Sequence, residues 1–321
     1  MKKLAVLLAA LLSGCVSVDL TLGAGRGTYT EKVVDPDADA KSKIALIDVE
    51  GVLTSDQEDS LFQSSDSHVV ALVEKLKIAE ADPDVKAVIL RIDSPGGDVT
   101  TSDILYNELL AFKGRKKVPV IAVFMGVAAS GGYYLASACD EIVAHPTTVT
   151  GSIGVIAMHV SLSGLLEKIG VKVEALKSGA NKDIGSPFRN MTDDEKKLLQ
   201  ALIDQFYGRF VGVVAEGRKG RLTEAQVRSL ADGRVFTAQQ ALEAKLVDRI
   251  GYLADAVELA RSRAKEEKVK LVMYSRRPRK LENAYSATTT TPAFAAGDLA
   301  QARRLIGFHC YYLWEPYLLG K

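Results

Sequence analysis

The stretch VKAVILRIDSPGGD, residues 85–98, is an apolar run that ends in a Pro-Gly-Gly turn, and it decides the fold class. Its length and its β-branched residues predict a buried strand that leads into a loop. A helix is expected over 101–113 and a second strand over 120–125, while 44–53 predicts an earlier strand and 68–83 an amphipathic helix. This alternation predicts an α/β domain whose largely parallel sheet carries its chemistry in loops at the carboxyl ends of the strands.

Composition limits the classes of function. The chain has 321 residues, of which 47% are apolar, so it can bury a large core. Its 41 basic and 40 acidic side chains nearly cancel, which argues against nucleic acid as a partner. The sequence contains neither H-E-x-x-H nor G-x-x-x-x-G-K-[ST], so no metal and no nucleotide cofactor is expected.

The N-terminus predicts export. Lys2 and Lys3 precede an apolar run over 4–12, which is shorter than the roughly 20 residues that a membrane-spanning helix needs. Leu12-Ser13-Gly14-Cys15 resembles a bacterial lipobox, in which the cysteine is lipidated and becomes the mature N-terminus. We therefore expect acyl chains on Cys15 to anchor the protein to a membrane while its body stays in water.

Two glycine-rich loops follow successive predicted strands, namely Ser94-Pro95-Gly96-Gly97 and Ser130-Gly131-Gly132. Glycine lets backbone N–H groups approach a ligand closely and adopts positive φ, as a cradle for an oxyanion requires. Either Gly-Gly pair alone is equally consistent with a tight turn. Two such loops at the same edge of a sheet favour a site.

Ser130 lies in GVAASGGYYLASACDEIVAHP, residues 126–146, where a strand is expected to turn into a helix. That position suits a nucleophile, because the first N–H groups of a helix stabilise negative charge. On position alone a helix N-cap is the favoured interpretation, since serine fills that role well. Ala128 replaces the first glycine of a G-x-S-x-G motif, so an ordinary α/β-hydrolase is not indicated.

A nucleophilic serine needs a base. None of the histidines stands in a revealing context, and each is interpreted as structural: His68, His145, His159 (placed in an apolar strand) and His309. A lysine serves as the base where burial lowers its pKa toward neutrality. Lys182, in ALKSGANKDIGSPFR (175–189), is such a candidate.

Four blocks of sequence, in order, resemble the signal peptide peptidase A family of serine peptidases, and the likeness covers about residues 44–265. The blocks are DSPGGD (93–98), GVAASGGYYLASACDEIVAHPTTVTGSIGV (126–155), SGANKDIGSPFR (178–189) and DGRVFTAQQALEAKLVDRIG (232–251). The resemblance implies a Ser-Lys catalytic dyad, with Ser130 as the nucleophile and Lys182 as the general base. It also implies that Ser152, in TGSIG, orients the lysine amine.

By the same resemblance, backbone N–H groups form the oxyanion hole. Gly131 supplies one, and Gly97 supplies the other, with Gly96 as the alternative. The implied fold is like that of crotonases and of the Clp protease subunit, a superhelix of β-β-α units, and no cofactor is required. Helices expected over 192–217, opened by a capping-box pattern, and over 236–246 fit an outer part used for assembly, and their apolar residues fit the core of a monomer equally well. The family forms rings, so we expect a homo-oligomer in which neighbouring subunits complete each site.

The implied substrates are apolar peptides, notably signal peptides left in a membrane after leader cleavage. Anchoring through Cys15 predicts a location in the cell envelope, on the exported side of a membrane, and leaves inner and outer membrane open. Two alternatives remain: a catalytically silent scaffold lipoprotein, and a crotonase-type acyl-CoA enzyme, which would need neither Ser130 nor Lys182.

The resulting organisation is a signal peptide over 1–15, a flexible spacer over 16–43, the peptidase domain over 44–265, a linker over 266–298 and a tail over 299–321. Aromatic residues are dense in the tail: Phe308, Tyr311, Tyr312, Trp314 and Tyr317. Three interpretations stay open for it, namely a packing arm, a membrane-interface anchor, and a peptide that occupies the substrate groove.

Overall fold

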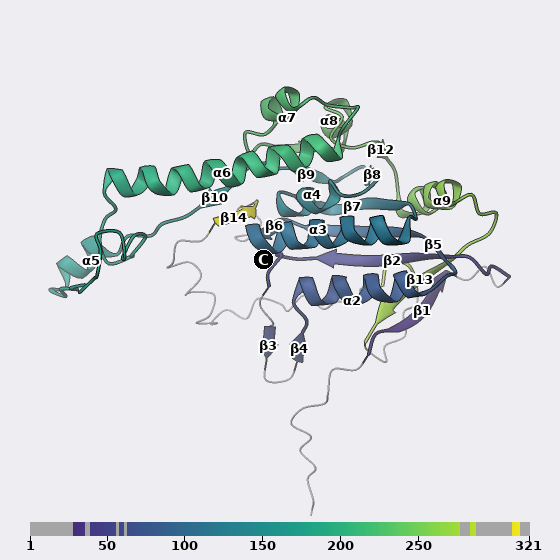
Figure 1. Cartoon of the computed structure of the whole chain (residues 1–321), viewed down its shortest axis with the longest axis horizontal. Helices are drawn as coiled ribbons and strands as arrows, with labels where there is room; N and C mark the ends of the chain where they lie inside the picture. The colour runs from purple at the N-terminus through teal and green to yellow at the C-terminus, as the bar shows by residue number, and fades with distance from the viewer. Residues whose placement is uncertain are drawn as a thin grey trace, which may run out of the picture.

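The computed structural model describes residues 28–35, 39–55, 58–60, 63–276, 283–286 and 310–314. Within them a large twisted sheet forms the centre, with helices on both faces (Figure 1). Its strands are β1 (Thr30–Asp35), β2 (Lys43–Glu50), β5 (Val85–Ser94), β7 (Val120–Ala129), β8 (Glu141–Ala144), β9 (Val149–Gly151), β11 (Val235–Thr237), β12 (Arg249–Ile250) and β13 (Lys270–Ser275).

The sheet has the order β1-β13-β2-β5-β7-β8-β12, and β9 pairs with the end of β7 and with β11. Every pairing from β13 to β12 is parallel, whereas β1 and β11 pair antiparallel. Two smaller sheets contain β3 (Glu58–Ser60) with β4 (Gln63–Ser65), and β6 (Gly96–Asp98) with β10 (Ile156–Ala157) and β14 (Cys310–Leu313). The predicted parallel α/β architecture is therefore present.

The helices within the described residues are α2 (His68–Ala81), α3 (Val99–Lys116), α4 (Gly131–Ala136), α5 (Ser163–Lys168), α6 (Asp193–Gly217), α7 (Glu224–Leu230), α8 (Ala238–Glu243) and α9 (Leu253–Ala264). The predicted capping box at Thr192 is present, since its side chain accepts from the Glu195 N–H while the Glu195 carboxylate accepts from the Thr192 N–H. Figure 1 shows α6 running out beyond the sheet, with α5 at its outer end.

Side chains of the central strands alternate between two cores, as the two-residue period of a strand requires. On β2, Ala45 and Ile47 face a core shared with α2, α3 and α4, whereas Ile44 and Leu46 face a core shared with α9. All four are fully or almost fully buried. Burial of each larger side chain contributes roughly 1.5–3 kcal/mol, so the sheet is fixed from both faces.

The structure corrects two of the expected boundaries. The spacer predicted over 16–43 contains β1, and the linker predicted over 266–298 contains β13, which pairs with β1 on one side and β2 on the other. Leu271, Val272 and Met273 are buried there, so this apolar run belongs to the core. Residues 1–27, with Cys15, lie outside the described part of the chain.

Strand β7 runs to Ala129, four residues beyond its predicted end at Met125. Its first half pairs with β8 and its second half, Val127–Ala129, pairs with β9. This extension carries the chain directly to Ser130.

Among the described residues, none of the helices combines the length and the apolarity that crossing a membrane requires.

Candidate active site

Ser130 is the hinge between β7 and α4, and its backbone is strained. Its φ of 51° and ψ of −115° lie in a region that glycine favours, and the residue is 1% exposed. A non-glycine residue held there costs on the order of 1–3 kcal/mol. The surrounding structure therefore forces the serine into this conformation.

The helix N-cap interpretation of Ser130 lacks its defining contact. Capping residues have extended backbone, and their side chain accepts an N–H of the first turn. Thr192, Thr223 and Thr237 in this protein do both, at φ of −75°, −82° and −68°. Ser130 does neither, because its φ is positive and its side chain makes no capping hydrogen bond. Its hydroxyl is thus not committed to the helix.

Strand pairing places Ser130 beside Ser152. Ala129 pairs with Gly151 in the parallel ladder, and the Ser130 N–H donates to the Gly151 carbonyl at 2.8 Å. The next residue on each strand is a buried serine with positive φ, which is 49° for Ser152. The Ser152 N–H donates to the Arg234 carbonyl at 2.8 Å, which fixes the loop from its other side.

The Gly96-Gly97 turn lies at the end of β5, the parallel neighbour of β7. The Leu53 N–H donates to Gly96, and the Asp98 N–H donates to Leu53, both at 2.8 Å. These bonds flank Gly97, so its own N–H and carbonyl face away from Leu53. A Cβ on Gly97 would lie 2.0 Å from the Leu53 carbonyl oxygen, so only glycine fits there.

The two glycine loops meet. A Cβ on Gly96 would lie 2.6 Å from the backbone nitrogen of Gly131, the residue after Ser130. The Gly96 N–H donates to the Ser94 hydroxyl at 3.1 Å, whereas the Gly97 N–H faces away from Leu53, on the side of β14. The structure thus assembles the serine and the glycines at one place, and its hydrogen bonds favour Gly97 over Gly96 as the donor to a ligand that takes the place of β14.

Two residues of the DSPGGD block, Asp93 and Ser94, shape these loops, although the sequence did not predict a role for either side chain. The Asp93 carboxylate accepts the Val127 N–H at 2.9 Å. The Ser94 hydroxyl donates to the Gly51 carbonyl at 2.7 Å and accepts from Gly96. Their presence in the quoted motif was the only available signal, because both act through backbone groups that are distant in sequence.

Lys182 lies elsewhere in the chain. Its side chain is exposed, on the turn-rich segment 169–192 between α5 and α6, and among the described residues no hydrogen bond joins it to Ser130. Figure 1 shows α5 and the turns beside it at the outer end of α6, away from α4. A single chain therefore brings Ser130, Ser152 and the glycine loops together, but not Lys182.

An ion-pair cluster fixes the segment that carries Lys182. Arg189 pairs with Asp183 at 2.7 Å and with Glu195, on the first turn of α6, at 2.8 Å. Hydrogen bonds from Arg189 and Lys177 hold the pKa of the Asp183 carboxyl well below its usual range. Those from Arg189 and the Thr192 N–H do the same for Glu195. The segment is thus anchored to α6.

The described histidines have partners remote from Ser130. The His68 ring contacts the Glu50 carbonyl at 2.8 Å, the His145 ring contacts the Thr147 hydroxyl at 2.9 Å, and that of His159 contacts the Ser186 carbonyl at 3.1 Å. His159 lies beyond the end of β10 and not within a strand as expected, because β10 is only two residues long. His309 falls outside the described residues.

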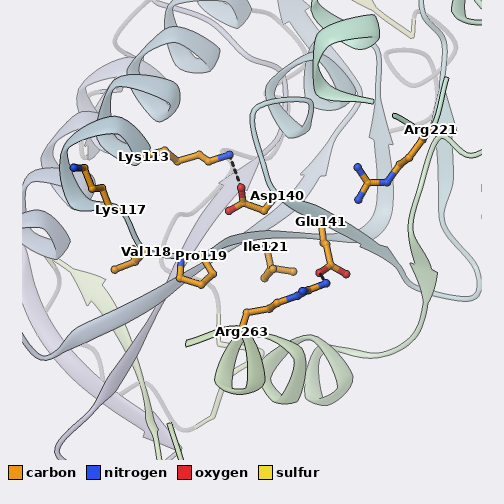
Figure 2. Close-up of a pocket in the computed structure, with 9 residues that line it drawn as sticks. All are labelled: Lys113, Lys117, Val118, Pro119, Ile121, Asp140, Glu141, Arg221 and Arg263. Carbon is orange, nitrogen blue, oxygen red and sulfur yellow. Dashed lines mark ion pairs between the residues drawn. The ribbon is translucent and has the colours of Figure 1, made fainter. Parts of the chain in front are cut away.

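A cavity of about 620 Å³ lies at the opposite edge of the sheet, by the starts of β7 and β8 (Figure 2). Lys113 pairs there with Asp140, and Arg263 pairs with Glu141. Its walls come from the amino ends of the strands, whereas ligands of open parallel sheets bind at the carboxyl ends. The glycine loops, and not this cavity, therefore form the candidate site.

Comparison with known proteins identifies the class. The sequence profile of Peptidase family S49 matches residues 113–267, and that of Clp protease matches residues 42–150. The molecule is a serine-type protease with an α/β fold of the Clp protease kind, as the sequence predicted.

A signal peptide peptidase SppA from Enterococcus faecium is 39% identical over 245 residues, which cover 76% of this chain and 69% of that protein. A protease from Synechocystis sp. is 43% identical over 220 residues, covering 68% and 74%. The chain therefore belongs to peptidase family S49, the family of signal peptide peptidase A. Protease 4 of Salmonella typhi is 32% identical over 262 residues, and the match spans 82% of this chain but 41% of that protein.

Proposed function

We propose that this protein is a membrane-tethered serine endopeptidase that hydrolyses apolar peptides, including signal peptides left in a membrane, with a Ser130–Lys182 dyad. The observation that carries the proposal is the buried, strained Ser130 beside the glycines of β6 and of the first turn of α4. Strain of this kind clusters at active sites, where it holds a reacting group in position. A scaffold protein would have no need to retain it.

In this proposal Lys182 reaches Ser130 from a neighbouring subunit. The lysine is exposed in the single chain, on a segment that is tightly anchored to α6. This segment forms an arm together with α5 and the first part of α6. Large apolar side chains are exposed on the arm: Ile169, Val173, Leu176, Phe188 and Leu198. Exposed apolar surface of this extent is typical of an interface between proteins. A ring of identical subunits would bury this surface and deliver each lysine to the next serine.

The chemistry follows from these positions. The Lys182 amine, held by the Ser152 hydroxyl, accepts the proton of the Ser130 hydroxyl as its oxygen bonds to a peptide carbonyl carbon. The Gly97 and Gly131 N–H groups stabilise the resulting oxyanion, and each such donor typically contributes on the order of a hundredfold in rate. The peptide C–N bond then breaks and the leaving amine takes the proton from Lys182. Water hydrolyses the Ser130 ester with the lysine again acting as base.

Lipidation of Cys15 would keep the enzyme at the surface of a membrane, in the cell envelope on the exported side. The support for this part is the lipobox-like sequence alone. Replacing Cys15 with alanine is expected to move the protein from the membrane fraction to the soluble fraction while peptidase activity persists. Fractionation followed by a fluorogenic peptide assay checks both points.

The dyad is tested by mixing inactive variants. Ser130→Ala and Lys182→Ala should each abolish hydrolysis of a fluorogenic apolar peptide. Co-assembled in equal amounts, they should recover about a quarter of the wild-type activity, because in a head-to-tail ring one site in four receives both intact groups. Wild-type activity should rise with pH through a single deprotonation, since only a neutral amine accepts a proton.

Each of the other possible results of this experiment would contradict one part of the proposal. Activity in both single variants would show that the dyad is wrongly assigned. Inactive single variants whose mixture is also inactive would place both groups of a site in one chain. An inactive wild type under all conditions would favour the silent scaffold, whereas turnover of acyl-CoA thioesters would favour the crotonase-type enzyme.

A further inference from the structure

Helix α2 begins beside the loop 50–54, which follows β2. Ser67 caps the helix, since its side chain accepts a backbone N–H of the first turn at 3.3 Å, and His68 is the first helical residue. The imidazole of His68 bridges the two ends of the loop. Its Nε2 lies 2.8 Å from the Glu50 carbonyl oxygen, and its Nδ1 lies 3.4 Å from the Thr54 nitrogen.

These two contacts define which nitrogen of the ring carries the hydrogen. The Thr54 N–H can only donate, so Nδ1 is the acceptor and carries no hydrogen. The Glu50 carbonyl can only accept, so Nε2 carries the hydrogen and donates it. His68 therefore uses both ring nitrogens to hold the loop 50–54.

The peptide unit between Leu53 and Thr54 joins His68 to the end of the glycine turn. Its N–H donates to the imidazole, and its carbonyl accepts the Asp98 N–H at 2.8 Å. Because a peptide group is planar, a partner that holds the N–H also fixes the direction of the carbonyl. The bond from Asp98 thus depends on the orientation that His68 imposes.

The peptide unit between Glu50 and Gly51 is held in the same way at the other end of the loop. Its carbonyl accepts from His68, and its N–H donates to the Asp93 carbonyl at 2.9 Å. The Ser94 hydroxyl adds a bond to the Gly51 carbonyl at 2.7 Å. Both ends of the loop therefore lie between His68 and the chain that carries the glycine turn.

The middle of the loop sets the direction of the Gly97 N–H. The Leu53 N–H donates to the Gly96 carbonyl at 2.8 Å. That carbonyl and the Gly97 N–H belong to one trans peptide unit, in which they point in opposite directions. Leu53 is fully buried, and a Cβ on Gly97 would lie 2.0 Å from its carbonyl oxygen, so the two backbones are in close contact. A shift of Leu53 would therefore turn the Gly97 N–H.

We propose that His68 is a positioning residue for the oxyanion hole: it holds the loop 50–54 so that the Gly97 N–H points at the oxyanion that forms when Ser130 bonds to a substrate. This inference rests on the proposed function, since it takes Gly97 as a donor to that oxyanion. His68 acts through Leu53, because its side-chain hydrogen bonds go to the loop alone.

His68→Phe tests the proposal, because it keeps a ring of similar size and removes both hydrogen bonds. An oxyanion donor acts in the transition state and typically contributes on the order of a hundredfold in rate. A misdirected donor should therefore lower kcat at least about tenfold while KM stays within about twofold. The full-length protein is assayed with a fluorogenic apolar peptide, and circular dichroism confirms that the variant is folded. An unchanged kcat, or a change confined to KM, would overturn the assignment.

His68→Asn separates the hydrogen bond from the packing of the ring. The asparagine carbonyl oxygen lies near the place of Nδ1 and accepts the Thr54 N–H. This variant should be at least about threefold faster than His68→Phe, since one hydrogen bond is restored. If His68→Phe were the faster of the two, the ring would only pack against the loop, and the proposal would fail.

His145 provides the matched control. Its ring contacts only Thr147, two residues further on, whose N–H it accepts at 3.3 Å and whose hydroxyl lies at 2.9 Å. His145→Phe should leave kcat within about twofold of the wild type, because no bond to the glycine turn is lost. An equal loss of kcat in His145→Phe and His68→Phe would show that the loss is not specific to the loop 50–54.

Hydrogen exchange distinguishes failure of this inference from failure of the proposed function, because it requires no catalysis. Exchange of the Leu53 and Asp98 N–H groups, followed by mass spectrometry, should accelerate at least about tenfold in His68→Phe, since two bonds that hold the loop are lost. It should not change in His145→Phe. Unchanged exchange in His68→Phe would refute the role of His68. Accelerated exchange in a protein whose wild type hydrolyses no peptide would refute the peptidase, while the dependence of the loop on His68 would stand.

Discussion

At the scale of a single residue, Ser130 is held in an unfavourable backbone conformation. Its positive φ is imposed by the Gly151 contact before it and by α4 after it, and its Cβ makes this conformation unfavourable. Ser130→Gly removes the Cβ, so this variant should be more stable than Ser130→Ala by about 1 kcal/mol. Both variants should be inactive. Chemical denaturation followed by circular dichroism measures the difference.

The neighbouring Ala129 provides the control, because it lies in β7, where glycine brings no relief. Ala129→Gly should lower the free energy of unfolding by about 0.5–1 kcal/mol. If Ser130→Gly and Ser130→Ala unfold at the same denaturant concentration, the serine carries no strain, and the main support for a catalytic role is lost.

At the scale of an element, the segment between α5 and α6 presents Lys182 and is held by Arg189. Arg189→Gln should leave Asp183 and Glu195 without their common partner, loosening the segment while the sheet stays intact. Peptidase activity is expected to fall at least about tenfold, since a small misplacement of a catalytic group is costly, and limited proteolysis within 169–192 should accelerate. Lys196→Gln is the control, because the Lys196–Asp193 pair is exposed on α6 and should contribute little.

The same cluster sets a pH dependence. Both carboxyl groups have a pKa lower in the folded protein than in the unfolded chain. Their contribution is therefore fully present above the unfolded values of about 4 and is lost as the pH falls through the folded pKa values. Protection of the segment against proteolysis should be constant from neutral to mildly alkaline pH and should fall only in strong acid. A loss near neutral pH would show that other groups hold the segment.

At the scale of the whole molecule, α5 and the first part of α6 form an arm that extends beyond the sheet (Figure 1). Leu198 is 54% exposed and Leu202 is 41% exposed on α6. If this surface joins subunits, changing both residues to glutamate should yield monomers by analytical ultracentrifugation. These monomers should lack peptidase activity, because each would be deprived of a partner's lysine. Their thermal unfolding should match that of the wild-type subunit.

Leu110, on α3, is exposed to a similar degree and lies off the arm, so Leu110→Glu should preserve both assembly and activity. Monomers of the Leu198→Glu, Leu202→Glu variant that remain fully active would show that one chain contains a complete site. An unchanged sedimentation coefficient would place the subunit interface elsewhere.

The sequence predicted best those strands and helix starts whose signal comes from residues near one another in the chain. Apolar runs such as 85–94 and 120–125 predicted buried strands, and Thr192 with Glu195 predicted a helix start, because periodicity and capping depend on nearby residues. The family followed from motifs. The boundaries at 44 and 265 missed β1 and β13, since these two strands are stabilised mainly by pairing with each other and with β2.

The sequence by itself determined the α/β class, the family and the identity of the candidate residues, because these depend on residue type and spacing along the chain. Only the tertiary structure decided that Ser130 is strained and uncapped, that its glycine loops meet while Lys182 lies on a distant arm, and that Tyr312 of β14 is buried against the rings of Tyr134 and Phe210. The physical reason is that each of these properties arises from backbone groups far apart in sequence, which only the pairing of strands brings into contact.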